Sequence, residues 1–101
     1  MNEKLLHLLG IARRAGRLTL GNDAVVEALR KGTAHLVLFA SDLSPRTVHG
    51  VEFAAEEEGV AAVKTKATMD EISMALGKRT GVVAVNDTGF AKKLIALCAD
   101  E

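Results

Sequence analysis

The sequence predicts an α/β protein: a three-layer α/β/α sandwich around a mixed four-stranded sheet, formed as a single domain over residues 1–101. Segments with apolar residues at helical spacing alternate with short apolar runs along the chain, and short turns join them. The run HLVLFA, residues 35–40, is apolar throughout, as expected for a strand covered on both faces. A chain of 101 residues, 49% of them hydrophobic, suits one core.

Local signals set the ends of the elements in the first half of the chain. Gly16 and Gly32 are expected to end the first two helices, because glycine adopts the left-handed conformation that commonly follows a helix. Ser44 is a good N-cap and Pro45 suits a first helical turn, so a third helix begins there. The expected order is a helix at 3–15, a strand at 17–20, a helix at 22–31, a strand at 35–40 and a helix from Pro45 that Gly59 ends.

The second half repeats the alternation. Thr68 and Glu71 have the spacing of a capping box, which predicts a helix over 69–76 that stops at Gly77. Asp87 or Thr88 is expected to cap the last helix. The expected strands are VAAVKT at 60–65 and GVVAV at 81–85, and the final helix contains FAKKLIALC.

Charge is balanced in total but uneven along the chain. Thirteen Lys and Arg residues match thirteen Asp and Glu residues. Residues 1–34 hold six basic and three acidic side chains, whereas residues 35–59 hold one basic and five acidic ones. A neutral protein can still bind a polyanion if its cations converge on one face.

Enzymatic motifs are missing from the sequence. The Gly77-Lys78-Arg79-Thr80 segment lacks the upstream glycine and the magnesium-binding hydroxyl of a phosphate loop, and no GxGxxG follows a strand. His49, Glu52 and Glu56 share one helix face without a second ligand cluster, so a solvated face is favoured over a metal site. We therefore expect a non-enzyme that holds no cofactor and no metal.

A lone Cys98 and the pattern of hydrophobic residues bear on location. One cysteine cannot form an internal disulfide, fits a reducing cytoplasm and is expected to act as a small apolar residue. No apolar run is long enough to span a bilayer. We expect a cytoplasmic protein without a membrane partner.

The turn Gly21-Asn22-Asp23 before the second helix has two interpretations. Asn and Asp commonly cap a helix, which is a structural role. A helix N-terminus also offers unpaired N–H groups and partial positive charge to an anion, and Gly21 would allow another backbone to approach. Asn22 and Asp23 could then hydrogen-bond base edges.

The order of these motifs resembles a known ribosomal-protein family. Residues 21–32, the strand His35–Ala40, the segment Ser41–Pro45, and the later stretch from Thr68 to Val85 are similar to the kink-turn RNA binders of the ribosomal seven-Ae and thirty-e type. The stretches NDTGFAKKL and LLGIARRAG look like its small bacterial YlxQ-like branch. The resemblance implies the three-layer fold and the gripping of a sharply bent RNA by the start of the second helix and the loop after the third strand.

Four positions depart from the pattern that the resemblance implies; one is Leu20, where the family often has a basic residue before the glycine. Asp23 stands at the family's Asn position, Ala24 at its Glu position and Glu27 at its Lys position. Asp23 keeps hydrogen-bond acceptors but loses the amide donor, Ala24 makes no polar contact, and Glu27 is negative where a cation would meet phosphate.

Two hypotheses follow. The first is a monomeric ribosomal-type protein that recognises folded, kink-turn-like RNA, with ribosomal RNA as a candidate, and not DNA. Recognition would use phosphate contacts and shape, with Arg17 beside the Gly21 turn and the Lys64–Thr68 loop completing one cationic cradle. The second is a protein–protein interaction module on the same scaffold that has lost kink-turn binding. The candidate RNA-binding residues are Arg17, Gly21, Asn22, Asp23, Arg30, Lys31, Lys64, Lys66 and Thr68.

Overall fold

The protein alternates helix and strand from one end to the other. The computed structural model describes residues 3–101, and every predicted element is present there with small shifts at its ends. None of the described helices combines the length and apolar character needed to cross a bilayer. The elements are α1 (Glu3–Arg14), β1 (Leu18–Leu20), α2 (Asn22–Lys31), β2 (Leu36–Phe39), α3 (Pro45–Glu57), β3 (Ala62–Lys64), α4 (Met69–Leu76), β4 (Val82–Val85) and α5 (Thr88–Ala99).

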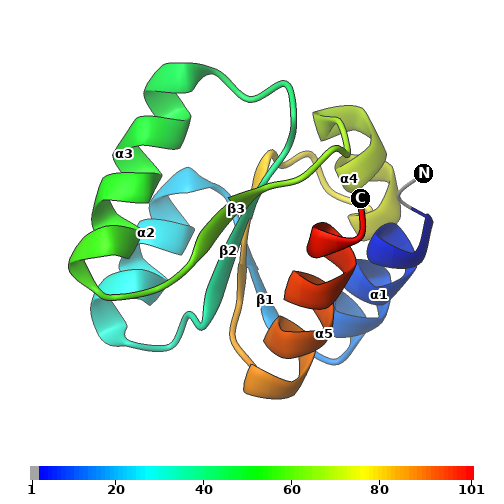
Figure 1. Cartoon of the computed structure of the whole chain (residues 1–101), viewed down its shortest axis with the longest axis horizontal. Helices are drawn as coiled ribbons and strands as arrows, with labels where there is room; N and C mark the ends of the chain where they lie inside the picture. Colours follow the sequence, from blue (N-terminus) through cyan, green and yellow to red (C-terminus); the bar gives the residue numbers. More distant parts are fainter. Residues whose placement is uncertain (1–2) are drawn as a thin grey trace.

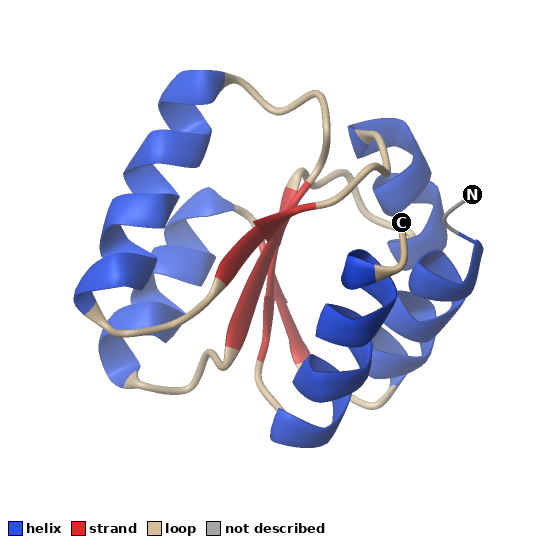
Figure 2. Ribbon diagram, viewed as in Figure 1, coloured by secondary structure: helices blue, strands red, loops and turns tan. Residues whose placement is uncertain are grey.

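The four strands form one mixed sheet in the order β1-β4-β2-β3. Strand β4 pairs antiparallel with both β1 and β2, whereas β2 and β3 run parallel. Strands β1, β2 and β3 therefore all point the same way, and their carboxyl ends lie at one end of the sheet together with the start of β4. Helices cover both faces of the sheet, as predicted (Figures 1 and 2).

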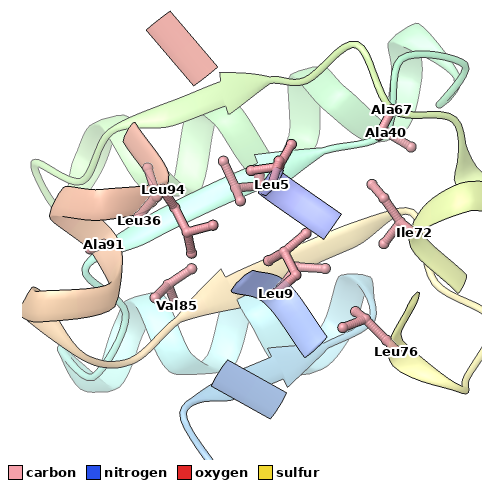
Figure 3. Packing of buried hydrophobic residues seen from close by; sticks show 12 residues of the cluster. Leu5, Leu9, Leu36, Ala40, Ala67, Ile72, Leu76, Val85, Ala91 and Leu94 are labelled. Carbon is pink, nitrogen blue, oxygen red and sulfur yellow. The ribbon is translucent and has the colours of Figure 1, made fainter. Parts of the chain in front are cut away.

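The central strands are buried on both faces, which explains the unbroken apolar run in β2. Leu36 and Leu38 pack into a core with α1, α4 and α5, which Figure 3 shows from close by. Val37 and Phe39 point to the opposite face, under α2 and α3. This alternation follows from the two-residue period of a strand. The sheet thus separates two apolar clusters, with three helices on one side and two on the other (Figure 1).

Most of the predicted helix ends are confirmed. Gly32 adopts the left-handed conformation after α2, with φ 78°. The Ser44 hydroxyl accepts a hydrogen bond from the Thr47 N–H at the start of α3. Of the two candidate caps for α5, Asp87 makes the bond, accepting from the Phe90 N–H.

The predicted capping of α2 by Asn22 and Asp23 is wrong. The N-cap residue is Gly21, with φ 96° and ψ 150°, and no side chain caps this helix. Asn22 is already the first helical residue, because the chain leaves β1 and turns directly into α2 at the glycine. This leaves the start of α2 unlike the starts of α3, α4 and α5, each of which has a side-chain cap.

Thr68→Ala should destabilise the fold by about 1 kcal/mol, because it removes the cap of α4. The Thr68 hydroxyl accepts from the Glu71 N–H at 3.1 Å, and the Glu71 carboxylate accepts from the Thr68 N–H at 2.9 Å. Urea unfolding followed by circular dichroism measures the loss. Thr88→Ala is the matched control, since Thr88 is an exposed threonine in a first helical turn and does not cap its helix. Equal stability of the two variants would contradict the capping role.

Candidate functional site

The carboxyl end of the sheet gathers the loops that start α2, α3 and α4. The Gly21 N–H donates to the Val82 carbonyl at 3.1 Å, which ties the β1–α2 turn to the start of β4. The Ala40 N–H donates to the Gly81 carbonyl at 2.9 Å, which ties the β2–α3 loop to the same segment. In open α/β sheets, ligands bind at this end, because several loops converge there.

The start of α2 offers free backbone donors at this end. Among residues 3–101, no hydrogen bond uses the N–H groups of Asn22, Asp23 or Ala24; the first N–H with a partner belongs to Val25, which donates to the Gly21 carbonyl at 2.9 Å. The first turn of a helix also carries partial positive charge. With a glycine as the N-cap, no Cβ obstructs the approach of an acceptor to these groups.

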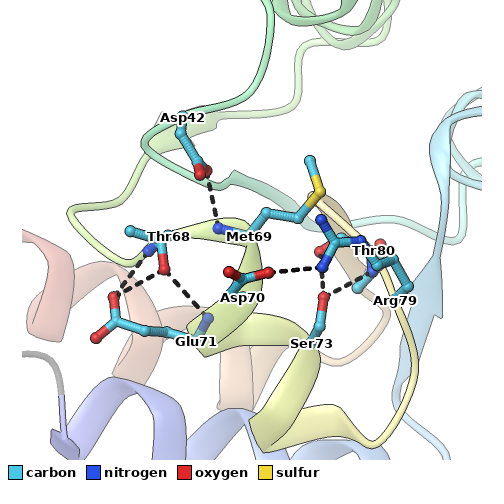
Figure 4. A network of polar contacts seen from close by, with 8 residues as sticks. All are labelled: Asp42, Thr68, Met69, Asp70, Glu71, Ser73, Arg79 and Thr80. Carbon is cyan, nitrogen blue, oxygen red and sulfur yellow. Dashed lines mark hydrogen bonds and ion pairs between the residues drawn. The ribbon is translucent and has the colours of Figure 1, made fainter.

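The Lys64–Thr68 segment differs, because the protein's own carboxylates occupy its donors. The Lys66 N–H donates to Glu101 Oε1 at 3.0 Å, and the Thr68 N–H donates to Glu71 Oε1. The next N–H, at the first residue of α4, donates to Asp42 Oδ1 at 2.8 Å (Figure 4). An incoming phosphate would meet three carboxylates here.

The predicted cradle of Arg17, Lys64 and Lys66 is wrong. Arg17 precedes β1, and its carbonyl accepts from the Asn86 N–H after β4, so it lies at the opposite end of β1 from the Gly21 turn. Lys64 is the last residue of β3, on the far edge of the sheet from β1. Three strand spacings, about 14 Å, separate β1 from β3. Arg17 is separated from Gly21 by the length of β1, and Lys64 is separated from both by the order of the strands, which the sequence does not reveal.

The remaining predicted residues are spread over several surfaces. Arg30 and Lys31 end α2, about 12 Å along the helix from Asn22. Lys31 pairs with Glu27 at 2.7 Å, and this pair lowers the pKa of the exposed Glu27 carboxyl through a hydrogen bond and charge attraction. Thr68 is engaged in its capping box.

A shallow hollow runs along the free edge of β1, and the sequence analysis did not assign it. We call this surface the β1 hollow. Its volume is about 380 Å³. The charged side chains that line it are Arg13, from the last turn of α1, and Lys78, from the α4–β4 loop. The other lining residues are Leu18, Thr19, Leu20 and Ala24.

The β1 hollow adjoins the start of α2, because Ala24 belongs to the first turn of that helix. None of the described residues that line it is acidic; Glu27, one turn further along α2, lines a separate groove toward α3. Lys78 reaches the hollow because β4 lies next to β1 and brings the loop before it to this edge. In the sequence, the basic pair Lys78-Arg79 was the signal for a cationic surface. Its position beside β1 could not be deduced from the order of residues along the chain.

Arg79, the next residue in the α4–β4 loop, is held by an internal partner. Its guanidinium donates to Asp70 Oδ1 at 2.6 Å, and both side chains are largely exposed (Figure 4). An exposed pair of this kind contributes at most about 1 kcal/mol. Arg79 can therefore leave Asp70 and pair with another anion at a small cost in free energy.

Chemistry other than binding has little support in the described part of the chain. Residues 3–101 contain no group of three His, Cys, Asp or Glu side chains arranged to hold a metal ion. Burial, with a smaller contribution from Glu101, raises the pKa of the Cys98 thiol to about 11, so it stays protonated at neutral pH. A protonated thiol is a poor nucleophile.

Comparison with known proteins gives a consistent result. The model of the ribosomal protein L7Ae/L30e/S12e/Gadd45 family matches residues 3–95. The chain is 37% identical over 91 residues to the RNA-binding protein YlxQ of Bacillus subtilis, covering 89% of this chain and 90% of that one. It is 37% identical over 90 residues to the large ribosomal subunit protein eL8 of Haloquadratum walsbyi, covering 85% and 73%. A solved structure from Bacillus halodurans, of unknown function, superposes with a TM-score of 0.90 at 33% identity, covering 97% and 98%.

Proposed function

The chain belongs to the ribosomal protein L7Ae/L30e/S12e/Gadd45 family, and on that premise we propose that it binds folded RNA through the start of α2 and the β1 hollow. Its relatives are ribosomal and RNA-binding proteins, not enzymes. The observation that carries the proposal is the uncapped first turn of α2 beside a hollow whose charged side chains, Arg13 and Lys78, are both cations.

Phosphate is the RNA group that this surface suits best. The N–H groups of Asn22, Asp23 and Ala24 can donate to phosphate or base oxygens, and Gly21 lets the RNA backbone come close. Arg13 and Lys78 would neutralise charge on the same strand and release its counterions.

Recognition would depend on the shape of the RNA more than on stacking of its bases. The chain has three Phe and neither Tyr nor Trp. Phe39 is fully buried, Phe90 packs against the core at the other end of the sheet, and Phe53 lies between α2 and α3. None of them lines the β1 hollow. A sharply kinked RNA, which presents several phosphates and an exposed guanine edge within a short distance, suits the start of α2 and the β1 hollow.

Lys64 and Lys66 take a secondary role in this proposal. They lie at the same end of the sheet as Gly21 but on its far edge, so only an RNA that extends across the four strands would reach them. Arg17, Arg30 and Lys31 lie toward the opposite end of the sheet and are not part of the proposed surface.

Arg13→Ala combined with Lys78→Ala should weaken binding to a kink-turn RNA and reduce the slope of log affinity against log salt by about 1.4 to 1.8, since two phosphate contacts are lost. Filter binding over a salt series measures both quantities. Lys92→Ala with Lys93→Ala is the matched control, because these exposed lysines lie on α5, away from the hollow. Lys64→Ala with Lys66→Ala should have a smaller effect than the Arg13 and Lys78 pair. An unchanged slope in the Arg13 and Lys78 variant would refute the assignment.

Asp70→Asn should strengthen RNA binding by up to about fivefold, because it releases Arg79 from its 2.6 Å partner for contact with phosphate. The gain should shrink as salt is raised. Glu56→Gln removes an equal charge from an exposed position near the end of α3, at the opposite end of the sheet, and serves as the control. If both variants bind RNA equally well, the effect comes from net charge and the role of Arg79 is excluded.

A further inference from the structure

A second surface lies on the other side of α2, in the groove that this helix forms with α3. Figure 1 shows the two helices side by side on the face of the sheet opposite α1, α4 and α5. The groove has a volume of about 670 Å³. We call it the α2–α3 groove; it is lined by Asn22, Asp23, Val26, Glu27 and Arg30 of α2 and by Gly50, Phe53, Ala54 and Glu57 of α3.

An exposed aromatic side chain stands in this groove. Phe53 is 65% exposed, whereas Phe39 is fully buried and Phe90 packs against the core. Isolated apolar residues are common on surfaces, but a large aromatic ring beside a concave groove is typical of the anchors of protein interfaces. Among residues 3–101, neither of the two buried apolar clusters includes Phe53.

The lining of the groove includes an exposed glycine, Gly50, whose missing side chain no neighbouring atom requires. Gly50 lies inside α3 with helical geometry, where glycine destabilises a helix relative to alanine. A Cβ built at this position would meet no atom within 4 Å, so no neighbouring element demands the missing side chain. The space that Gly50 leaves open is space inside the groove.

The charged residues that line the groove indicate which class of ligand would bind there. Three lining residues are acidic, and only Arg30 is basic. Glu27 is paired with Lys31 at 2.7 Å, whereas no ion pair within residues 3–101 involves Asp23 or Glu57. Beyond the first turn of α2, where the Asn22 and Asp23 N–H groups lie, these carboxylates would repel phosphate and attract a positively charged chain.

We propose that the α2–α3 groove docks a basic segment of a partner protein. An apolar side chain of that segment packs against Phe53 and fills the space above Gly50, while flanking Lys or Arg residues contact Asp23 and Glu57. The β1 hollow and the groove then serve two different ligands, and the two surfaces meet at the first turn of α2, because Asn22 and Asp23 also line the groove. Phe53 and Glu57 lie on α3, outside the proposed RNA surface, so the docking can be tested independently of RNA binding.

The test uses a labelled synthetic helical peptide with Leu at every fourth position and Lys on both sides of that stripe. A second peptide with Glu in place of Lys is its control. Fluorescence anisotropy in low salt should show that the wild-type protein binds the Lys peptide and not the Glu peptide. Phe53→Ala should weaken binding at least tenfold, and Glu57→Gln should weaken it and reduce its salt dependence.

Two further variants separate docking from folding. Gly50→Gln should weaken peptide binding at least tenfold and leave the urea midpoint equal to or above that of the wild type, since glutamine favours the helix but blocks the groove. Met74→Ala removes a side chain that is 85% exposed on α4, and it should bind the peptide like the wild type. Phe53→Ala should retain full affinity for RNA.

Several results would overturn the proposal. They are binding of both peptides or of neither, equal binding by the Phe53→Ala protein, and loss of RNA affinity in that variant. Sedimentation of the wild type as a dimer that Phe53→Ala converts to a monomer would identify a second copy of this chain as the occupant and would also overturn it.

Discussion

Strand β4 holds the molecule together, because it hydrogen-bonds to both β1 and β2 and is buried along its whole length. It is the last strand in the sequence, yet it lies between the first two in space. Its antiparallel direction makes the start of β4 meet the ends of β1 and β2. The bond from the Gly21 N–H to the Val82 carbonyl is one result, and it fixes the turn before α2 against the α4–β4 loop.

The three helices that begin at this end of the sheet differ in whether side chains accept hydrogen bonds from their first N–H groups. Helices α3 and α4 use the protein's own Ser44, Thr68 and Asp42. Helix α2 follows β1 through a single glycine and has no side chain in position to cap it. Unpaired donors at a helix start remain available to solvent or to a ligand. The same backbone geometry that lets the chain turn sharply at Gly21 therefore leaves N–H donors there that can bind an oxygen atom of a ligand.

Although the net charge of the protein is zero, two surfaces of opposite charge lie on either side of α2. The β1 hollow carries Arg13 and Lys78, and the α2–α3 groove carries three carboxylates and one guanidinium. Glu27 lines the groove, where Lys31 pairs with it, and is absent from the hollow. Its negative charge consequently does not face the surface proposed to meet phosphate. A zero net charge is compatible with surfaces of opposite sign, because dissolved salt screens the electrostatic field of each surface over a short distance.

The sequence by itself determined the elements and their ends, because these depend on interactions between residues close in the chain. The helical spacing of apolar residues, the Thr68 and Glu71 capping box and the left-handed Gly32 are all of this kind. Family membership was also readable from the order of motifs. The grouping of charges was not. Arg17 lies at the other end of β1 from Gly21, which the strand predicted at 17–20 already implied. The neighbours of Lys64 and Lys78 depend on strand order, because the inserted β4 brings Lys78 to β1 and leaves Lys64 on the far edge. Only the tertiary structure could decide that, because the neighbours of a loop are chosen by hydrogen bonds between strands that are distant in the sequence.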